Sequence, residues 1–386
     1  MSSLANASTS QGVTDASNDD VYVCNPLEDG TRKFRVTVLI SGSGSNLAAL
    51  MSALPNKLST CQIVKVISNS KDAFGLERAR QHEPYPIPCM SFSPFQFQKS
   101  RPDLFQKDEQ EIKNLSNEMK QDPKNEQLKQ RWIETKRILT NKVKPLYQLA
   151  LADQIKSTKP DLIVLAGFML ILLPQTLERL TRDWIESDSI EATGTTTTLG
   201  KSPYRAQCYE DGQLTTGTPI PIINLHPALP GSFVGPHVIE DAWEAFNQIK
   251  LPSTKDEWER LKDTVAQKRM QAMESKDSKD DKELEVVTKS LASSSVTDSS
   301  NVNPTTTTTT SSSSSFGPRI DKTGIMIHRV IPELDRGEPV LWRQIEMKPG
   351  EWIDDLKTRI HQVEHEAIVD AVKVVTDHLR DGTWWK

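Results

Sequence analysis

The sequence lacks the features that mark several large classes of protein. Its four cysteines form no Cys-x-x-Cys pair, which gives no sign of a disulfide framework or a structural zinc site. The longest apolar run, Leu162 to Leu173, is too short to cross a bilayer. The N-terminus has neither the basic region nor the apolar region of a signal peptide. These absences predict a soluble, cytoplasmic protein with no membrane partner.

The chain also has no excess of basic residues. Lys and Arg number 47 and Asp and Glu 52, which gives a net charge of −5 over 386 residues. Proteins that bind nucleic acid usually carry a positive surface, so we expect no nucleic-acid partner. The mean hydropathy of −0.50 is polar for a chain of this length and indicates segments that cannot belong to a core.

Three polar segments account for the low hydropathy. Residues 1–31 are rich in Ser, Asn, Asp and Thr and predict a disordered tail. Residues of about 186–217 and 250–317 are read as insertions, the second being charged at first and then almost entirely Ser and Thr. Such insertions are tolerated because loop-closure entropy grows only logarithmically with length. We therefore predict one domain over residues 32–386, with roughly 250 residues of core sequence.

The rest of the chain alternates between strand and helix patterns. The predicted strands cover residues 34–41, 62–68, 87–92, 161–167, 221–225, 323–331 and 339–347. The predicted helices cover 46–53, 73–82, a long charged region of roughly 108–156, then 237–246 and 351–379. Alternation of this kind predicts an α/β fold with a mostly parallel central sheet and helices on both faces. The last two strands are joined by a short loop, which predicts an antiparallel C-terminal portion.

A glycine-rich loop, SGSGSN, follows the first predicted strand at residues 41–46. Backbone N–H groups at a helix N-terminus behind such a turn bind anions. A dinucleotide motif would need a third glycine where Leu47 stands, and the nucleotide P-loop pattern is absent. A small phosphorylated metabolite therefore fits better than NAD or ATP, although a simple capped turn is also compatible with the loop.

Asn224 and His226 follow a strand predicted to lie in the middle of the sheet, in the segment NLHPALPG. Ligands of open α/β sheets bind beyond the carboxyl ends of the strands. There the asparagine can donate to a developing oxyanion and the histidine can donate or move a proton. A loop histidine without a catalytic role is the competing interpretation.

Two further patterns need weighing. Asp335, in the loop PELDRGEP, could orient His226 as the carboxylate of a triad does, or be an ordinary turn residue. His361 to His365 reads HQVEH, which matches a zinc-binding HxxEH pattern. That pattern arises easily on a charged helix, so we predict no metal.

Taken together, six blocks resemble the phosphoribosylglycinamide formyltransferase family of folate-dependent enzymes in purine synthesis. In chain order they are VTVLISGSGSNLAAL, VISNSKDAFGLERARQ, PDLIVLAGFMLIL, INLHPALPG, TGIMIHRV with ELDRGEPV, and RIHQVEHEAIV. The resemblance covers roughly 250 residues, about the size of one large α/β domain. It implies a Rossmann-like formyltransferase fold and transfer of a formyl group from 10-formyltetrahydrofolate to glycinamide ribonucleotide.

The resemblance also implies roles for individual residues. The catalytic residues would be Asn224, His226 and Asp335. The ribonucleotide would be held by Gly44, Ser45, Asn46, Glu364 and His361, the last of which stands where the family has a glutamine. The folate would contact Met169, Leu170, Ile171, Leu172, Lys144, His237, Ile331, Pro332, Glu333 and Leu334. Lys144 aligns with a family arginine, and Arg137 is its rival for that place.

The nearest alternatives are other formyl enzymes and a scaffold. A methionyl-tRNA formyltransferase should have a basic C-terminal domain, and a formyltetrahydrofolate hydrolase should have a regulatory domain before the first strand. A non-catalytic scaffold would be expected to lack Asn224, His226 or Asp335, and all three are present. We therefore expect small-molecule substrates, with a monomer or a homodimer equally compatible with the sequence.

Overall fold

The computed structural model describes residues 27–28, 30–182, 217–271 and 319–384, and the backbone of four short strands between residues 189 and 214. The predicted tail up to residue 26 and the Ser/Thr-rich part of the second predicted insertion, 272–318, lie outside the described residues. The division of the chain into one domain with insertions therefore stays a prediction.

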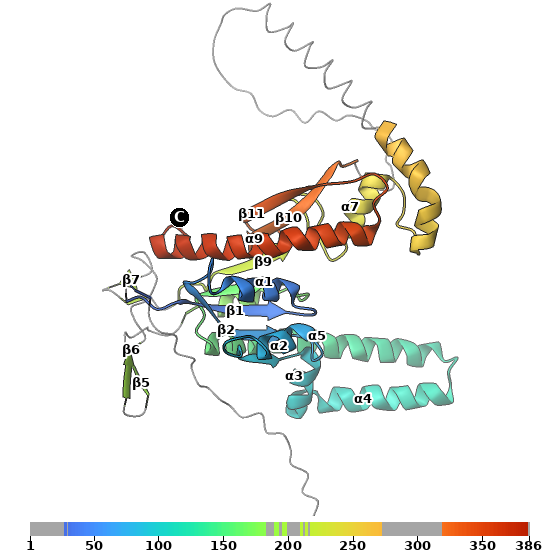
Figure 1. The fold of residues 1–386 in the computed structure, drawn as a ribbon. Helices are drawn as coiled ribbons and strands as arrows, with labels where there is room; N and C mark the ends of the chain where they lie inside the picture. The colour runs from blue at the N-terminus through green and yellow to red at the C-terminus, as the bar shows by residue number, and fades with distance from the viewer. Residues whose placement is uncertain are drawn as a thin grey trace, which may run out of the picture.

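A seven-stranded mixed sheet organises the chain (Figure 1). The strands lie in the order β11, β10, β9, β4, β1, β2, β3. From β9 to β3 every pairing is parallel, whereas β10 pairs antiparallel with both β9 and β11. This arrangement confirms the predicted mostly parallel sheet with an antiparallel C-terminal portion. The bounds are β1 (Phe34–Ile40), β2 (Cys61–Ser68), β3 (Cys89–Ser91), β4 (Leu162–Leu165), β9 (Ile222–His226), β10 (Lys322–Arg329) and β11 (Pro339–Glu346).

Helices cover both faces of the sheet, as predicted. One hydrophobic cluster joins the sheet to α1 (Ser45–Ala53), α2 (Phe74–Arg80), α7 (Val238–Asn247) and α9 (Ile353–Asp381). A second cluster, on the opposite face, joins it to α3 (Pro94–Ser100), α4 (Pro102–Gln121), α5 (Glu126–Ser157) and the loops around α6 (Pro174–Arg179). The remaining strands are β5 (Ser189–Ala192) with β6 (Thr195–Thr198) and β7 (Tyr209–Glu210) with β8 (Gln213–Leu214). None of the helices in the described ranges combines the length and the apolar character that crossing a membrane requires.

Strand β4 shows why its sequence is a nearly continuous apolar run. All four of its residues are buried. Leu162 and Val164 belong to the first cluster, and Ile163 and Leu165 belong to the second. Side chains of a strand alternate between the faces of a sheet, so a strand covered on both sides needs apolar residues at every position.

The long helical region predicted at roughly 108–156 is divided by a turn at residues 122–125. The structure has two helices there, α4 and α5, which pack against each other and extend away from the sheet (Figure 1). Pro123 disfavours helical backbone at the preceding residue, which ends α4. The Asn125 side chain then accepts from the Leu128 amide at 3.2 Å and caps α5. Apart from Pro123, residues 120–127 contain no apolar side chain, in agreement with a solvent-facing turn between the two helices.

A fully buried aspartate stabilises the end of β4 opposite the cavity described below. The Asp161 carboxylate accepts from the Arg32 guanidinium at 2.5 and 2.9 Å and from Arg182 at 2.5 Å. It also accepts from the Arg35 amide at 2.7 Å. Burial by itself would raise the pKa of Asp161, but the two guanidinium groups outweigh it and hold the pKa well below its usual value. The pairing connects the segment before β1 with the segment after α6.

A helix over residues 255–271 lies inside the segment predicted as a charged insertion, and it packs on the sheet domain. Trp258 is 0% exposed and contacts Trp243 edge-to-face at 4.9 Å and Trp352 in a stacked arrangement at 6.1 Å. Near the end of this helix, Arg269 lies over the Phe246 ring at 4.5 Å and donates to the Ile320 carbonyl at 2.6 Å. The helix therefore braces α7 and the starts of β10 and α9.

We predict that Trp258→Ala lowers the free energy of unfolding by about 3–5 kcal/mol, because it opens a cavity between three indole rings. Denaturant unfolding of purified protein measures this change. Met270→Ala is the matched control, since Met270 is on the same helix and 49% exposed. Equal effects of the two substitutions would contradict the assignment of the helix to the core.

Candidate functional site

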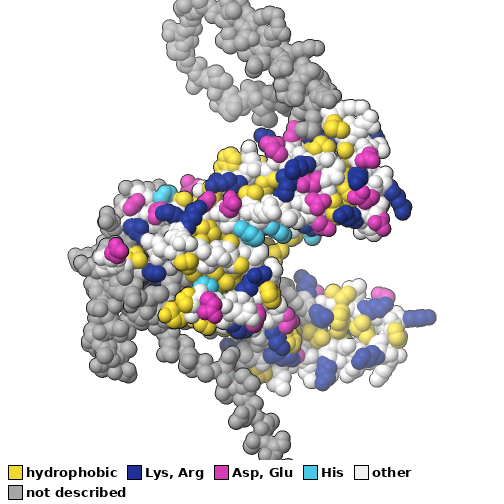
Figure 2. All heavy atoms as spheres, in the orientation of Figure 1, with side chains coloured by type: hydrophobic (Ala, Val, Ile, Leu, Met, Phe, Trp, Pro, Cys, Tyr) yellow, Lys and Arg dark blue, Asp and Glu magenta, His cyan; other side chains and the backbone are white. Residues whose placement is uncertain are grey.

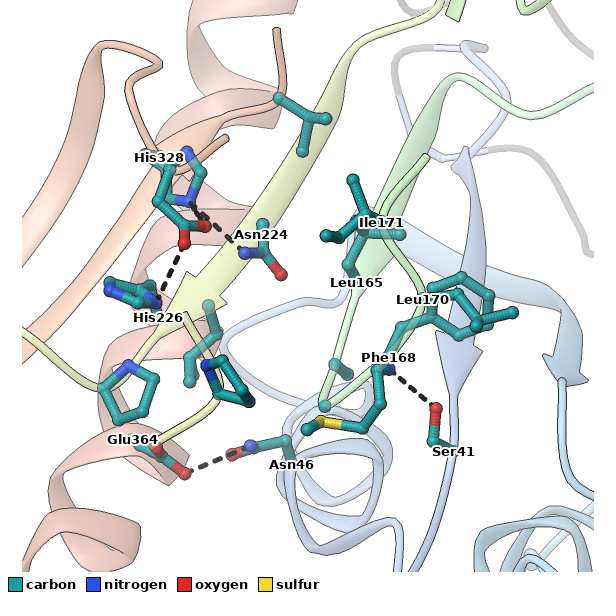
Figure 3. A pocket seen from close by; sticks show the side chains of 18 of the residues that line it. Ser41, Asn46, Leu165, Phe168, Leu170, Ile171, Asn224, His226, His328 and Glu364 are labelled. Carbon is teal, nitrogen blue, oxygen red and sulfur yellow. Dashed lines mark hydrogen bonds and ion pairs between the residues drawn. The ribbon is translucent and has the colours of Figure 1, made fainter. Parts of the chain in front are cut away.

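A cavity of about 860 Å³ lies at the carboxyl ends of β1, β4 and β9, between the glycine-rich loop and helix α9 (Figure 3). Nearly all of the predicted site residues, from five separate parts of the sequence, line it. They are Gly44, Ser45, Asn46, Met169, Leu170, Ile171, Leu172, Asn224, His226, Ile331, Pro332, Glu333, Leu334, Asp335, His361 and Glu364.

Two predicted folate contacts do not line the cavity. Lys144 is exposed on α5, and its rival Arg137 pairs with Glu134 at 2.6 Å on the outer face of the same helix. Both residues lie in the part of the chain where the helix hairpin extends away from the sheet. His237 is exposed at the N-terminus of α7, although its neighbour Pro236 does line the cavity.

The glycine-rich loop owes its shape to two close backbone contacts. Gly44 has φ of 68°, and a Cβ on it would lie 2.5 Å from Cα of Gly75. The Gly75 amide donates to the Gly42 carbonyl at 3.1 Å, and the Arg78 guanidinium donates to the Ser43 carbonyl at 3.0 Å. No side chain caps α1, and its first residues, Ser45 and Asn46, line the cavity, so this helix N-terminus can serve as an anion site.

Asn46 and Glu364 connect this loop to helix α9. The Asn46 amide Nδ2 donates to Glu364 Oε2 at 3.3 Å, as Figure 3 shows. Asn46 Oδ1 is buried and has no hydrogen-bond partner. Burial raises the pKa of Glu364, and the nearby His361 and Asn46 only partly offset that effect. A buried acceptor without a partner next to a carboxyl group suits a ligand that carries hydroxyl or amine donors.

Asn224, His226 and Asp335 meet on the opposite wall of the cavity. His226 Nδ1 lies 3.6 Å from Asp335 Oδ2, and both side chains are buried. His226 Nε2 donates to the Phe233 carbonyl at 3.0 Å. Asp335 has φ of 53°, a left-handed conformation that aspartate adopts more easily than most residues. Figure 2 shows histidine side chains in the hollow beside α9.

His328 joins this group, and the sequence analysis did not single it out. Its Nε2 lies 3.3 Å from Asn224 Nδ2 and 3.5 Å from Asp335 Oδ1 (Figure 3). Its Nδ1 donates to the Arg329 carbonyl at 2.8 Å, so a neutral ring presents an acceptor at Nε2 to the Asn224 amide. The antiparallel pairing of β10 with β9 sets His328 opposite Asn224. His328 can be recognised as a neighbour of Asn224 only from the pairing of β9 with β10.

Asp335 faces both histidines. Burial would raise the pKa of Asp335, but the neighbouring His328 and His226 side chains outweigh it and hold the pKa below its ordinary value. The carboxylate therefore stays ionised at neutral pH. The cluster can hold a proton next to the Asn224 amide donor.

The segment after β4 forms an apolar wall that is unusually exposed for such side chains. Met169 is 67% exposed and Ile171 54%. The Met169 amide donates to Ser41 Oγ at 2.7 Å, which ties this wall to the glycine-rich loop. Buried Gln148, from α5, donates to the Ile171 carbonyl and accepts from the Leu173 amide, both at 2.7 Å. This ordered wall of exposed apolar side chains suits a flat aromatic ligand.

The HQVEH pattern does not form a metal centre in the structure. His361 and Glu364 line the cavity, whereas His365 does not. Across the described ranges, no three His, Cys, Asp or Glu side chains are grouped so that they could hold a metal ion.

The comparisons with known proteins all point to formyl transferases. The sequence model of the formyl transferase family matches residues 34–186 and 316–372. Phosphoribosylglycinamide formyltransferase of Dictyostelium discoideum is 27% identical over 344 residues, which cover 89% of this chain and 98% of that protein. The enzyme of the same name from Saccharomyces cerevisiae is 26% identical over 349 residues, with the same coverage. The crystal structure of glycinamide ribonucleotide transformylase 1 from Symbiobacterium toebii is 17% identical, with a TM-score of 0.44 over 89% of this chain and 88% of that one.

The matched residues include the glycine-rich loop, Asp335 and Glu364, whereas Asn224 and His226 fall in the unmatched stretch between the two blocks. The structure nevertheless brings all of them to one cavity. The pairing of β9 with β4 therefore places Asn224 and His226 beside the matched residues, which the family match by itself does not show.

We predict that Gly44→Ala destabilises the protein and weakens binding of inorganic phosphate. The positive φ at residue 44 costs a non-glycine residue about 1–2 kcal/mol, and the new Cβ would collide with Gly75. Denaturant unfolding and phosphate titration measure the two effects. Gly42→Ala is the control, since a Cβ there meets nothing within 4 Å. Unchanged stability of Gly44→Ala would refute the loop geometry.

Proposed function

Because the chain belongs to the formyl transferase family, we propose that it transfers the formyl group of 10-formyltetrahydrofolate to the amine of N1-(5-phosphoribosyl)glycinamide. The products would be the formylglycinamide ribonucleotide and tetrahydrofolate, in the synthesis of purines. Two relatives that carry the name of this activity align along 98% of their own length.

One observation carries the proposal above all. The Asn224, His226 and Asp335 group and the glycine-rich loop lie on facing walls of a single cavity. Asn46 of that loop donates a hydrogen bond to Glu364 on helix α9. A phosphate at the N-terminus of α1 would leave the other end of a ribonucleotide near Asn224 and His226. The cavity of about 860 Å³ lies within the usual range for small-molecule sites.

Asn224 and His226 stabilise the charge that develops during transfer. As the substrate amine attacks the formyl carbon, the formyl oxygen gains negative charge. Asn224 Nδ2 donates to that oxygen, and His226 Nε2 donates to it in place of the Phe233 carbonyl that it contacts at 3.0 Å. Each donor aimed at such a charge is typically worth about 3 kcal/mol in the barrier.

Asp335 and His328 position the two donors. The Asp335 carboxylate holds a proton on Nδ1 of His226, so that His226 presents a cationic ring to the oxyanion. His328 Nε2 lies beside the Asn224 amide and orients its Nδ2 donor. Proton transfer from the attacking amine to the departing folate nitrogen completes the reaction, and no covalent link to the protein is needed.

The two substrates would occupy different walls. Gly44, Ser45 and Asn46 bind the phosphate through backbone N–H groups, and Glu364 and His361 contact the ribose or glycinamide part. The pterin lies along residues 169–172 and 331–334, where exposed apolar side chains can hold it. The proposal includes a cytoplasmic location, no nucleic-acid partner and either a monomer or a homodimer.

A direct assay tests the proposal. Purified protein is given 10-formyltetrahydrofolate with glycinamide ribonucleotide, with methionyl-tRNA, or with water alone as the acceptor. We expect formyl transfer to the ribonucleotide in preference to both alternatives. Faster release of formate to water, or faster transfer to the tRNA, would replace the proposed activity by one of the related formyl enzymes.

We predict that Asn224→Ala and His226→Ala each lower kcat by about 10²–10³-fold, because each removes one donor to the oxyanion. Steady-state kinetics with both substrates measures the change. His378→Ala, an exposed histidine near the end of α9, is the control and should retain wild-type kcat. Near wild-type turnover of His226→Ala would exclude the proposed role.

We predict that Asp335→Asn lowers kcat by about 10²-fold or more while KM for the ribonucleotide changes little. Asparagine tolerates the left-handed backbone of residue 335 as aspartate does, so the substitution removes the charge without straining the loop. A rise of KM for the ribonucleotide by a similar factor, with kcat unchanged, would show that Asp335 acts in binding instead.

A further inference from the structure

The cavity wall carries an uneven set of charges. Four carboxyl groups line it, from Glu240, Glu333, Asp335 and Glu364. Within the described residues, Lys357 is the one Lys or Arg side chain on the lining. A phosphate monoester carries a charge of about −1.5 to −2 at pH 7. A substrate of this kind would therefore enter a site whose carboxyl groups outnumber its Lys and Arg side chains.

Lys357 lines the cavity from helix α9. It precedes His361 by four residues and Glu364 by seven on α9, so the three side chains share one face of the helix. Along an α-helix this separation is about 10 Å from Lys357 to Glu364. Glu364 in turn contacts Asn46 of the glycine-rich loop.

The Lys357 ammonium is held by a carboxylate from the other helix at the cavity rim. Its Nζ lies 2.8 Å from Oε1 of Glu240 on α7, and the two side chains are 34% and 30% exposed. Burial would raise the pKa of Glu240, but its hydrogen bond with Lys357 helps to lower it below the usual value. An ion pair this exposed adds little to folding stability, so exchanging its carboxylate for another anion costs little.

We propose that Lys357 is a binding residue for the phosphate of the acceptor substrate, and that Glu240 holds its ammonium until that phosphate replaces the carboxylate. This inference rests on the proposed function. Lys357 offsets the carboxylates of the lining when the phosphate enters, and Glu240 competes with the substrate for the same ammonium. Binding then becomes stronger when Glu240 is neutral and weaker when Lys357 is neutral.

The competing explanation is a purely structural ion pair between α7 and α9. Breaking a structural pair from either side should disturb the cavity in the same direction. Competition predicts opposite signs for the two substitutions. The sign of the change in KM for glycinamide ribonucleotide therefore separates the two explanations.

The experiment compares steady-state kinetics of Lys357→Met and Glu240→Gln with the wild type at low ionic strength, where charge effects are least screened. We expect Lys357→Met to raise KM for the ribonucleotide about tenfold and Glu240→Gln to lower it about threefold, with kcat unchanged in both. Lys357→Arg should retain most of the binding because it keeps the charge. The dephosphorylated acceptor, glycinamide riboside, should show no change in KM with Lys357→Met.

Lys373→Met is the matched control. Lys373 is on the same helix and pairs with Asp377 at 2.7 Å, but it does not line the cavity. Its KM should equal that of the wild type. Thermal unfolding of each variant shows whether it is folded, and Glu240→Gln carries the test by itself if Lys357→Met does not fold.

The inference is overturned if Glu240→Gln raises KM, if Lys357→Met leaves KM unchanged, or if KM for the riboside rises equally. Failure of the proposed function is a separate result, because it would show as absence of formyl transfer to the ribonucleotide by the wild-type protein.

Discussion

Strand β9 pairs parallel with β4 along one edge and antiparallel with β10 along the other, and the arrangement of the site depends on these two pairings. Asn224 and His226 are two residues apart on β9, so their side chains emerge on the same face. The antiparallel register sets His328 directly opposite Asn224. A slip of one residue in this register would move these side chains to the other face of the sheet. Ile223 and Leu225 alternate with Asn224 and His226 along β9 and belong to the hydrophobic core. Their burial holds that register.

The two walls of the cavity are held by helices from opposite faces of the sheet. Gln148 on α5 fixes the apolar wall through the backbone of residues 171 and 173, and Glu364 on α9 fixes the glycine-rich loop through Asn46. The helix of residues 255–271 braces the start of α9 through Trp258 and Trp352. A segment that looks peripheral in sequence thus supports the helix that carries His361 and Glu364.

Much of the site could be predicted because its residues follow predicted strands directly. The glycine-rich loop, the wall at Met169 and the pair Asn224 and His226 each stand at the carboxyl end of a parallel strand, where α/β sheets place their ligands. His328 and Gln148 could not be found in that way. His328 lies on β10, the antiparallel neighbour of β9. Gln148 lies within the long helix α5. Lys144, predicted from its spacing along the chain, does not line the cavity, and such spacing does not tell which way a helix side chain faces.

The sequence by itself determined the elements: the apolar run of β4, the left-handed turn at Gly44 and the acidic loop at Asp335 are local consequences of residue type. It also determined the family, through blocks kept in order along the chain. Only the tertiary structure decided which charges share a cavity. Asp335 meets two histidines there, and Lys357 stands among carboxyl groups with Glu240 as its partner. Electrostatic interactions depend on distance and burial, and both are fixed when the sheet and its helices pack.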